Sequence, residues 1–328
     1  SSLLSIRDDF TVACFNSQNN HIEYHKPIEF HMSKYNGEMI NIKSKNVDVC
    51  VSPNHKMWAQ KKTSSWSDFD KIKATDLSPT STYKFQSVAD WNGVSSVDSV
   101  KVLDKEIPIE LYLKFIGYLI SEGYLGQNYI DFVQKVDSVC LSDLKQVISS
   151  FAKIFDNKVY EREVESKKSK LDAAKKQPSN RWNARVNSKS LMDYFISEIG
   201  EDKKATSKYK RIPNWIKSLD KKLLLILLET LASGDGSKLK NKKSLAWKYY
   251  TISKQLADDI QEIAFKCGYS PSVSRRKIKT GNTEYIVSWS NASGGNYPII
   301  APNKKYPSKI NKIDYSGVVW CFEVPTGL

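Results

Sequence analysis

The stretch LLLILLETLASGDGSKLK, residues 223–240, decides how this chain folds. It begins as an unbroken run of leucine and isoleucine and ends abruptly in Gly-Asp-Gly. Apolar residues at this density over several turns predict a buried helix, and the glycines predict where it stops. Taken alone, the stretch describes a core helix with a glycine at its C-terminal end and a solvated Asp235.

A second stretch of the same plan precedes it. FIGYLISEG (residues 115–123) and LETLASGDG (residues 228–236) both end in an acid followed by glycine, and the two acids stand 113 residues apart. Each stretch has two small residues four positions apart, which lie on one helix face and allow two helix backbones to pack closely. These small residues are Gly117, Ser121, Thr230 and Gly234. The repeat predicts two helices side by side, with Glu122 and Asp235 together at one end.

Paired carboxylates of this kind point to a metal-dependent reaction. Two carboxylates that are brought together repel each other unless a cation lies between them. Carboxylate oxygens are the ligands that Mg²⁺ prefers, and paired metal sites activate water and stabilise the leaving oxygen in phosphodiester cleavage. Two core helices with unrelated acidic ends are the alternative interpretation.

The composition favours a polyanionic partner. The 328 residues carry a net charge of +14 and are 40% hydrophobic, which is typical of a globular, nucleic-acid-binding protein. Five scattered cysteines without C-x-x-C spacing argue against both a disulfide framework and a zinc site, and they favour a reducing compartment. No apolar run is long enough to cross a membrane, and no secretion signal is recognisable. We therefore expect no membrane partner and an intracellular location, in the cytoplasm of a microbial or phage-infected cell or in a nucleus.

An α+β domain is expected between two β-rich ends. Short β-branched segments dominate residues 1–105, and residues 301–328 are strand-like again. Between them, residues 106–300 repeat an order of helices and strands, in halves at about residues 107–200 and 219–300. A repeat of this length predicts a pseudo-two-fold pair of half-domains.

These features resemble the LAGLIDADG homing endonucleases, in particular the single-chain class with two motifs. The likeness covers about residues 107–300 and includes the accompanying segments KYKRIPNWI and YYTISKQLADDIQEIAFKCGY. The resemblance implies the topology αββαββα for each half. It implies that Glu122 and Asp235 are catalytic residues that bind Mg²⁺, for which Mn²⁺ can substitute. It also implies that the protein cleaves double-stranded DNA and acts as a monomer. Two departures, Glu122 for the commoner Asp and Thr230 for glycine, leave a nickase or an impaired enzyme as alternatives.

The family also uses lysines to organise the attacking water or to offset charge in the transition state. Lys210, in the sequence Lys-Arg-Ile-Pro before the second motif, matches one such position. A solvated lysine at a helix N-terminus is the alternative interpretation of Lys210. Its counterpart from the second half is expected among Lys304, Lys305 and Lys309, and we take Lys305 as the candidate.

In the family, strands from both halves lie in the DNA major groove, which is wide enough for a β-ribbon. The corresponding strands are expected at residues 129–135, 181–187, 246–252, 272–279 and 284–290. Arginine and glutamine side chains would read bases, and lysines would contact phosphates. The candidate DNA-binding residues are Gln134, Lys135, Arg181, Arg185, Lys248, Arg275, Arg276, Lys277 and Lys279. Alternation along residues 272–279 puts Arg276 on one side of the strand and Arg275, Lys277 and Lys279 on the other.

The two ends carry a second resemblance, to inteins and other Hint domains. VDVCVSPNHKMWA (residues 47–59), with Ser52 and His55, is similar to the block whose histidine assists the first acyl shift. SGVVWCFEVPTGL (residues 316–328) is similar to the penultimate block, with Cys321 where Asp is commoner. An endonuclease between two Hint segments is the layout of a large intein, here of phage or viral type.

The first intein block and the terminal His-Asn pair are not recognisable in the chain. Three explanations are open. The chain is trimmed, or it is a split intein whose missing fragment is another polypeptide, or it is an endonuclease with a vestigial Hint shell. The leading hypothesis is an intein-encoded, site-specific homing endonuclease that makes a Mg²⁺-dependent double-strand break at the insertion site. The alternatives are an intein that splices its exteins and has a weak endonuclease, and a DNA-binding protein with inactive nuclease motifs.

Overall fold

The computed structural model describes residues 10–44, 47–86, 88–165, 180–200, 205–239, 246–290, 299–300 and 309–327. The chain divides into two compact units. Unit 1 is formed by both ends of the chain, Ser1–Asn92 and Ala292–Leu328, and unit 2 is the continuous segment Gly93–Asn291. None of the helices in the described ranges is long and apolar enough to span a bilayer.

The first half of unit 2 has the order αββαββα that the sequence predicts. A β-hairpin leads into it, formed by β8 (Ser99–Val102) and β9 (Lys105–Pro108). The elements are α1 (Ile109–Ser121), β10 (Gly123–Leu125), β11 (Tyr129–Lys135), α2 (Leu141–Ile154), β12 (Val159–Val164), β13 (Arg181–Asn187) and α3 (Lys189–Ile199). The four strands form an antiparallel sheet in the order β10-β11-β13-β12.

The second half repeats this plan through Ser290. A short helix, α4 (Asn214–Lys217), leads into it. The elements are α5 (Lys221–Gly234), β14 (Gly236–Leu239), β15 (Ala246–Thr251), α6 (Lys254–Lys266), β16 (Ser272–Lys277) and β17 (Thr283–Ser290). The sheet order, β14-β15-β17-β16, corresponds strand by strand to that of the first half. The internal repeat read from the sequence is therefore a repeat of topology.

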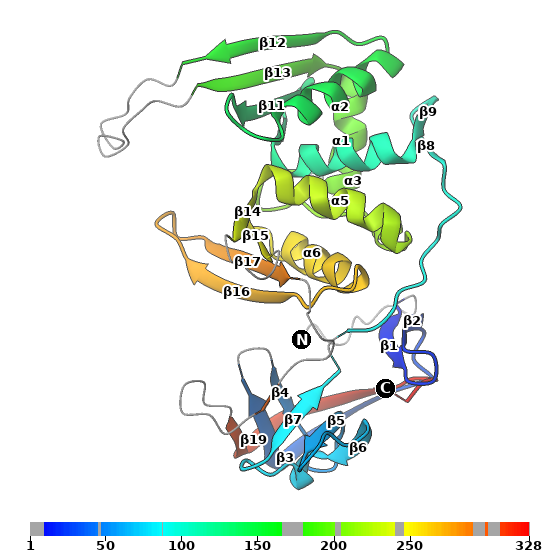
Figure 1. Ribbon diagram of the computed structural model, residues 1–328, viewed down its shortest axis with the longest axis vertical. Coiled ribbons are helices and arrows are strands. Elements are labelled where there is room, and N and C mark those ends of the chain that lie inside the picture. The colour runs from blue at the N-terminus through cyan, green and yellow to red at the C-terminus, as the bar shows by residue number, and fades with distance from the viewer. Residues whose placement is uncertain are drawn as a thin grey trace. The chain divides into compact units, whose positions relative to one another are not determined.

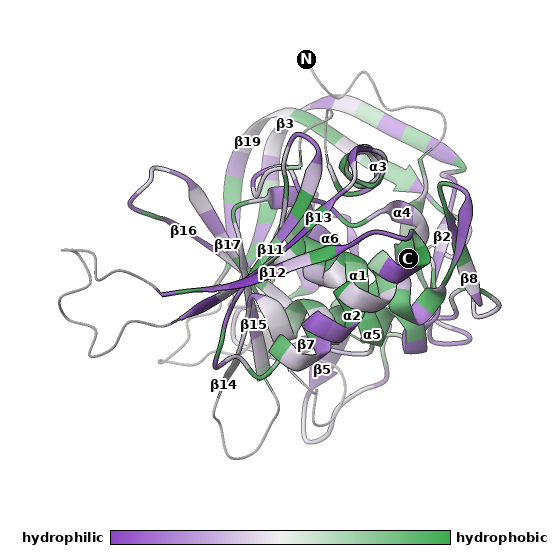
Figure 2. Ribbon diagram, turned by 90° about the horizontal axis from the view of Figure 1, so that it is seen from above, coloured by the Kyte–Doolittle hydropathy of each residue, from purple (hydrophilic) through white to green (hydrophobic). Residues whose placement is uncertain are grey.

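Local sequence explains where the main helices begin. The Asp220 carboxylate accepts a hydrogen bond from the backbone N–H of Leu223 at 2.9 Å and caps α5, and Ser253 caps α6 in the same way. Pro108, which has no N–H to leave unpaired, precedes α1. α1 and α5 pack against each other in the middle of unit 2 (Figure 1), and the hydrophobic colour of Figure 2 gathers on both helices.

Each sheet of unit 2 buries one face. Alternate residues of β13 (Trp182, Ala184 and Val186) are buried, as are Val287 and Trp289 of β17. Because side chains alternate along a strand, the residues between them lie on the opposite face of the sheet, which we call the outer face. The outer face of each sheet is the one available to a ligand.

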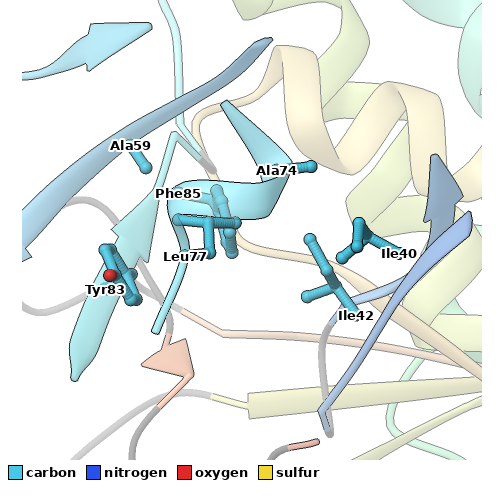
Figure 3. Close-up of a cluster of buried hydrophobic side chains, with 7 residues drawn as sticks. All are labelled: Ile40, Ile42, Ala59, Ala74, Leu77, Tyr83 and Phe85. Atoms are coloured by element: carbon cyan, nitrogen blue, oxygen red, sulfur yellow. The ribbon is translucent and has the colours of Figure 1, made fainter. Parts of the chain in front are cut away.

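Unit 1 consists of strands and one short 3₁₀ helix in its described residues. The strands are β1 (Val12–Asn16), β2 (His21–His25), β3 (Glu29–Lys43), β4 (Asp48–Val51), β5 (Lys56–Lys62), β6 (Asp70–Lys73), β7 (Thr82–Phe85), β18 (Ile299–Ile300) and β19 (Lys309–Glu323), and the 3₁₀ helix is η2 (Ala74–Asp76). They form sheets of order β19-β3-β4, β18-β7-β5-β6 and β1-β2. Both larger sheets contain a strand from each end of the chain. Figure 3 shows the buried cluster between them: Ile40, Ile42, Ala59, Ala74, Leu77, Tyr83 and Phe85.

Candidate active site

α1 and α5 approach each other through small residues. A Cβ on Gly117 would lie 2.9 Å from Thr230 Cγ2, and a Cβ on Gly234 would overlap the Ser121 side chain. Larger side chains at these two glycines would push the helices apart. The structure therefore brings together, in one helix contact, the four small residues singled out in the sequence.

Glu122 and Asp235 stand at the C-terminal ends of these helices. Glu122 donates its backbone N–H to the Tyr118 carbonyl at 2.7 Å, and both acids are the C-cap residues of their helices. The Glu122 carboxylate reaches across to the end of α5, because a Cβ on Gly234 would lie 2.9 Å from Glu122 Oε1. The two acids thus lie at the same end of the helix pair.

The glycine after each acid is required by a sharp turn into the next strand. A Cβ on Gly123 would lie 2.5 Å from the Leu119 carbonyl oxygen, and a Cβ on Gly236 would overlap the Ala232 carbonyl oxygen. Both carbonyls belong to the last turn of the preceding helix. The acid-glycine ending of each motif therefore follows from the turn that sends the chain from helix to sheet.

The two carboxyl groups are costly to ionise. Burial, and secondly the charge of Asp235, raise the pKa of Glu122 from 4.5 to about 7. Burial raises the pKa of Asp235 from 3.8 to about 6, although part of its side chain reaches solvent. Each carboxylate also stands at the negative end of a helix dipole. A divalent cation between the two groups would remove most of this cost.

Lys210 is buried beside the acids. Its ammonium group donates to the carbonyls of Leu119 at 3.1 Å, Ile120 at 2.7 Å and Gly123 at 2.8 Å. Leu119 and Ile120 lie in the last turn of α1, whose carbonyls have no partner within the helix, and Gly123 opens β10. The three bonds use all three protons of the ammonium group. Burial lowers the pKa of Lys210 to about 8, against the opposing effect of Asp235 and Glu122. The interpretation of Lys210 as a solvated surface lysine is therefore wrong.

Gln134 belongs to the acidic centre. Its side chain hydrogen bonds to Glu122 and thereby lowers the pKa of that carboxyl. Its Nε2 also lies 3.5 Å from the sulfur of the buried Cys140. Sequence reasoning assigned Gln134 to base reading because it falls in a predicted strand. The structure instead gives Gln134 a partner inside the site.

Tyr249 was not predicted from the sequence. Its ring is fully buried, and burial, Asp235 and Glu122 together raise the pKa of its hydroxyl well above the usual value. Tyr249 pairs with Gly236 in the β14–β15 ladder, directly after the second motif. That register would have indicated Tyr249, but β14 is too short to recognise from the sequence.

The outer face of the first sheet carries an ion pair. Arg185 makes two hydrogen bonds of 2.6 Å to the carboxylate of Asp131, and its guanidinium lies 3.7 Å above the Tyr129 ring. A pocket on this face is lined by Asp131, Val133, Tyr160, Glu161, Arg162, Asn183, Ala184 and Arg185. Lys135 and Arg181 are exposed and pair with each other at the end of the β11–β13 ladder. Arg185, predicted as a base reader, is therefore already held by Asp131.

In the second sheet, the outer face carries Lys248, paired across the ladder with Ser237 and Ser288. Arg276 lies on the same face, where its Nε donates to Glu284 at 2.6 Å. Arg275 and Lys277 lie on the other face, because their strand neighbour Val273 pairs with the buried Val287. The register confirms the predicted alternation, which separates Arg275 and Lys277 from Lys248 and Arg276. Lys279 is exposed in the turn before β17.

The remaining predicted residues lie in unit 1 or outside the described ranges. Lys305 falls outside the described residues. Ser52 and His55 form a turn in which the His55 N–H donates to the Ser52 carbonyl at 3.0 Å, and burial lowers the pKa of the His55 ring. Cys321 is exposed on β19, directly opposite His31 of β3.

The second half of unit 2 has a counterpart among known families. Residues 222–294 match a LAGLIDADG-like domain. The match runs from the second residue of α5 to beyond the end of β17 and includes Asp235. The predicted resemblance to LAGLIDADG proteins is thereby confirmed for the second copy of the motif.

Three curated proteins are similar along most of this chain. A section of a DNA-directed RNA polymerase β subunit from Stigeoclonium helveticum is 23% identical over 94% of the chain. A Clp protease proteolytic subunit from Chlamydomonas moewusii is 21% identical over 85%, and the DNA helicase Hel308 from Methanocaldococcus jannaschii is 26% identical over 78%. The chain spans only 32%, 27% and 19% of these proteins, respectively.

Two solved structures are distantly similar. I-DmoI in complex with DNA and Mn is 14% identical, with a TM-score of 0.39, and covers 55% of this chain and 89% of its own. The N-terminal LAGLIDADG domain of DUF199/WhiA is 13% identical, with a TM-score of 0.32, and covers 54% of this chain and 75% of its own.

Proposed function

We propose that unit 2 is a site-specific, divalent-metal-dependent DNA endonuclease that cuts both strands of a long double-stranded target. The observation that carries this proposal is the pair of carboxyl groups, Glu122 and Asp235, at the joined ends of two helices. Their raised pKa values describe a site that resists ionisation without a cation. The match of residues 222–294 to a LAGLIDADG-like domain supports the same function.

The donor atoms of the site fit a hard cation. Glu122 and Asp235 would hold Mg²⁺ or Mn²⁺ through carboxylate oxygens. When bound, the cation supplies the charge that activates water and stabilises a leaving phosphate-ester oxygen. Gln134 orients the Glu122 carboxylate, and Lys210 fixes the end of α1 and offsets negative charge at the scissile group.

The outer faces of the two sheets supply the DNA contacts in this proposal. They have the same strand order and carry Arg185, Lys135 and Arg181 in the first half, and Lys248 and Arg276 in the second. The net charge of +14 favours a polyanion. Because both half-domains lie in one chain, one copy supplies both carboxylates, and we propose that it acts as a monomer.

Cleavage selection tests this proposal. The full chain is incubated with a library of random DNA and host-gene fragments in Mg²⁺ and in Mn²⁺, and cut sequences are recovered. Enrichment of one long sequence, cut by the parent and not by Asp235→Asn, is the expected result. Cutting by both proteins would remove Asp235 from the site. Nicks on one strand only, seen on denaturing gels, would identify a nickase. Metal-insensitive binding without cleavage would identify a DNA-binding protein with inactive motifs.

We further propose that unit 1 is a Hint-like framework into which the nuclease is inserted, as in an intein. Two observations favour it. Unit 1 is formed by the two ends of the chain, and unit 2 is the continuous segment between them in the sequence. The three similar proteins bear the names of a polymerase, a protease and a helicase, and the chain spans a third or less of each. A shared segment in otherwise unrelated proteins is what an inserted element produces.

Splicing is tested with the first intein block and a terminal His-Asn pair supplied in the same polypeptide, between two reporter domains. We expect the parent to produce ligated reporters. We expect no ligated product from the His55→Ala or Cys321→Ala variant. Ligation that persists in both variants would remove these residues from the reaction. No ligation by the parent would leave unit 1 as a framework without splicing activity, and the nuclease proposal would stand.

A further inference from the structure

Four potential metal ligands gather on one face of the long ribbon of unit 1. β3 and β19 run antiparallel through fifteen pairs, and they lie side by side in Figures 1 and 2. Glu29 is paired with Glu323, and His31 with Cys321. Residues two apart on a strand point to the same face, so these four side chains form a rectangle on one side of the ribbon.

Three of the four side chains are already close enough to share an ion. His31 Nδ1 lies 3.5 Å from Glu29 Oε1, and His31 Nε2 lies 3.9 Å from Glu323 Oε2. One ligand atom from each residue lies within 4.8 Å of the others. Tetrahedral zinc bonds of about 2.0–2.2 Å place neighbouring ligand atoms ~3.4 Å apart. Side-chain rotations alone could therefore close the site, without movement of the backbone.

Two carboxylates face each other across this ladder. Like charges directly opposite each other across a ladder destabilise it, and Glu29 faces Glu323. Within the part of the chain that the structure describes, the ion pairs of these two carboxylates are with His31 alone. The side chains of His31, Glu29 and Glu323 are 55%, 61% and 58% exposed, so an ion can enter directly from solvent.

The ligand types select the metal. Imidazole and thiolate favour Zn²⁺ and Co²⁺ over Mg²⁺, which prefers an all-oxygen shell. The Cys321 sulfur is directed toward the neighbouring Phe322 carbonyl at 3.6 Å, and Cys321 is the cross-strand partner of His31. We propose that Glu29, His31 and Glu323 form a Zn²⁺-type site that Cys321 completes as the fourth ligand. This site is independent of the nuclease centre, shares Cys321 with the proposed splicing reaction, and would join strand ends that are 294 residues apart in the chain.

Cobalt titration tests the proposal. The full chain carries Glu122→Gln and Asp235→Asn, so that the nuclease centre does not compete for the ion. Absorption spectroscopy should show one equivalent of tetrahedral Co²⁺ with a thiolate charge-transfer band, displaced by Zn²⁺. His31→Ala should weaken binding by at least about tenfold. Cys321→Ser should remove the charge-transfer band and keep the visible bands.

His25→Ala is the matched control. The His25 ring also contacts a carboxylate two residues away on its strand, with Nε2 2.7 Å from Glu23 Oε2, but its cross-strand partner is Val12. This variant should bind Co²⁺ as tightly as the parent. Equal binding by parent and His31→Ala, or equal weakening by both histidine variants, would overturn the site. A parent spectrum without the thiolate band would overturn the role of Cys321. Because all ligands are exposed, circular dichroism should show that each variant is folded.

Discussion

Thr230 fills the space that Gly117 leaves open: its Cγ2 lies 2.9 Å from the point where a Gly117 Cβ would be. The Thr230 hydroxyl is bonded within its own helix, to the Ile226 carbonyl at 2.7 Å. The two positions correspond in the sequence repeat, yet one is glycine and the other is β-branched. The α1–α5 contact is therefore a fit of a side chain into a gap, and the two halves of the pair are not interchangeable.

Gly117→Ala should lower the free energy of unfolding by about 1–3 kcal/mol, because the new methyl group meets Thr230. In a Thr230→Ala background the same change should cost less, with a coupling energy of at least ~0.5 kcal/mol in a double-mutant cycle measured by urea unfolding. The control is Ser233→Ala, on the exposed side of α5. Gly281→Ala is unsuitable as a control because Gly281 has a positive φ, at which alanine is strained. Equal losses in both backgrounds would contradict the fit.

Glu122→Gln should stabilise the metal-free protein at pH 8. A carboxyl whose pKa rises from 4.5 to about 7 on folding binds its proton more tightly in the folded state. Its contribution is therefore favourable below pH 4.5 and is lost as the pH rises through about 7. Replacing it should raise the free energy of unfolding by roughly 2 kcal/mol at pH 8 and by little at pH 4. Urea unfolding in EDTA at the two pH values measures this, and a stabilisation independent of pH would be inconsistent with it.

Binding of Mg²⁺ or Mn²⁺ should release protons near pH 6.5. At that pH Glu122, with a pKa of about 7, is largely protonated, and Asp235, with a pKa of about 6, is partly so. A cation binds only the ionised forms, so affinity and cleavage rate should rise from pH 5.5 to pH 8. Calorimetry in two buffers of different ionisation enthalpy counts the protons. If the cation binds at pH 6.5 and at pH 8 and releases no protons at either pH, it binds elsewhere.

Lys210→Met should lower the free energy of unfolding by about 3 kcal/mol, since it leaves the buried carbonyls of Leu119, Ile120 and Gly123 without their donor. It should also abolish cleavage at temperatures where the variant is folded. The exposed Lys208 is the control, and Lys208→Met should change stability by less than about 0.5 kcal/mol. A stable but inactive Lys210→Met protein would mean that the lysine acts on the DNA and not on the helix end.

Lys248→Ala should weaken DNA binding and reduce the slope of log affinity against log salt by about 1, as expected for one lost phosphate contact. Lys277→Ala, on the opposite face of the same sheet, should have the smaller effect. Filter binding of the selected target at several salt concentrations measures both variants. A larger loss with Lys277→Ala would reverse the assignment of the outer face.

The sequence predicted the elements with strong periodicity. β11 and β13 fall at the predicted residues, and α1 and α5 were found from their apolar faces and acid-glycine ends. Three strands of the two four-stranded sheets of unit 2 were not predicted. β10 and β14 are only three and four residues long, and β12 is a polar edge strand whose residues are nearly all exposed. Periodicity carries no signal where neither face of a strand is buried.

The site could be predicted only in part, because its partners are distant in the sequence. Glu122 and Asp235 followed from the repeat. By contrast, Arg185 is held by Asp131, 54 residues away, and Lys210 by carbonyls about 90 residues away. Neither pairing can be recognised from the composition of the surrounding sequence. A lysine that caps a distant helix and a lysine in water look the same in a sequence.

The pairing of β3 with β19 also sets an order of events during synthesis. Unit 2 is one continuous segment and can fold as soon as Asn291 has left the ribosome. β3 must wait for β19, because Glu29 meets a partner that is translated 294 residues later. Until then, the Glu29 end of β3 has unpaired backbone groups on both edges, whereas the Lys43 end, which pairs with β4, has them on one edge. We expect the nascent chain to carry a folded unit 2 before unit 1 exists, so that the last-made strand completes the first-made sheet.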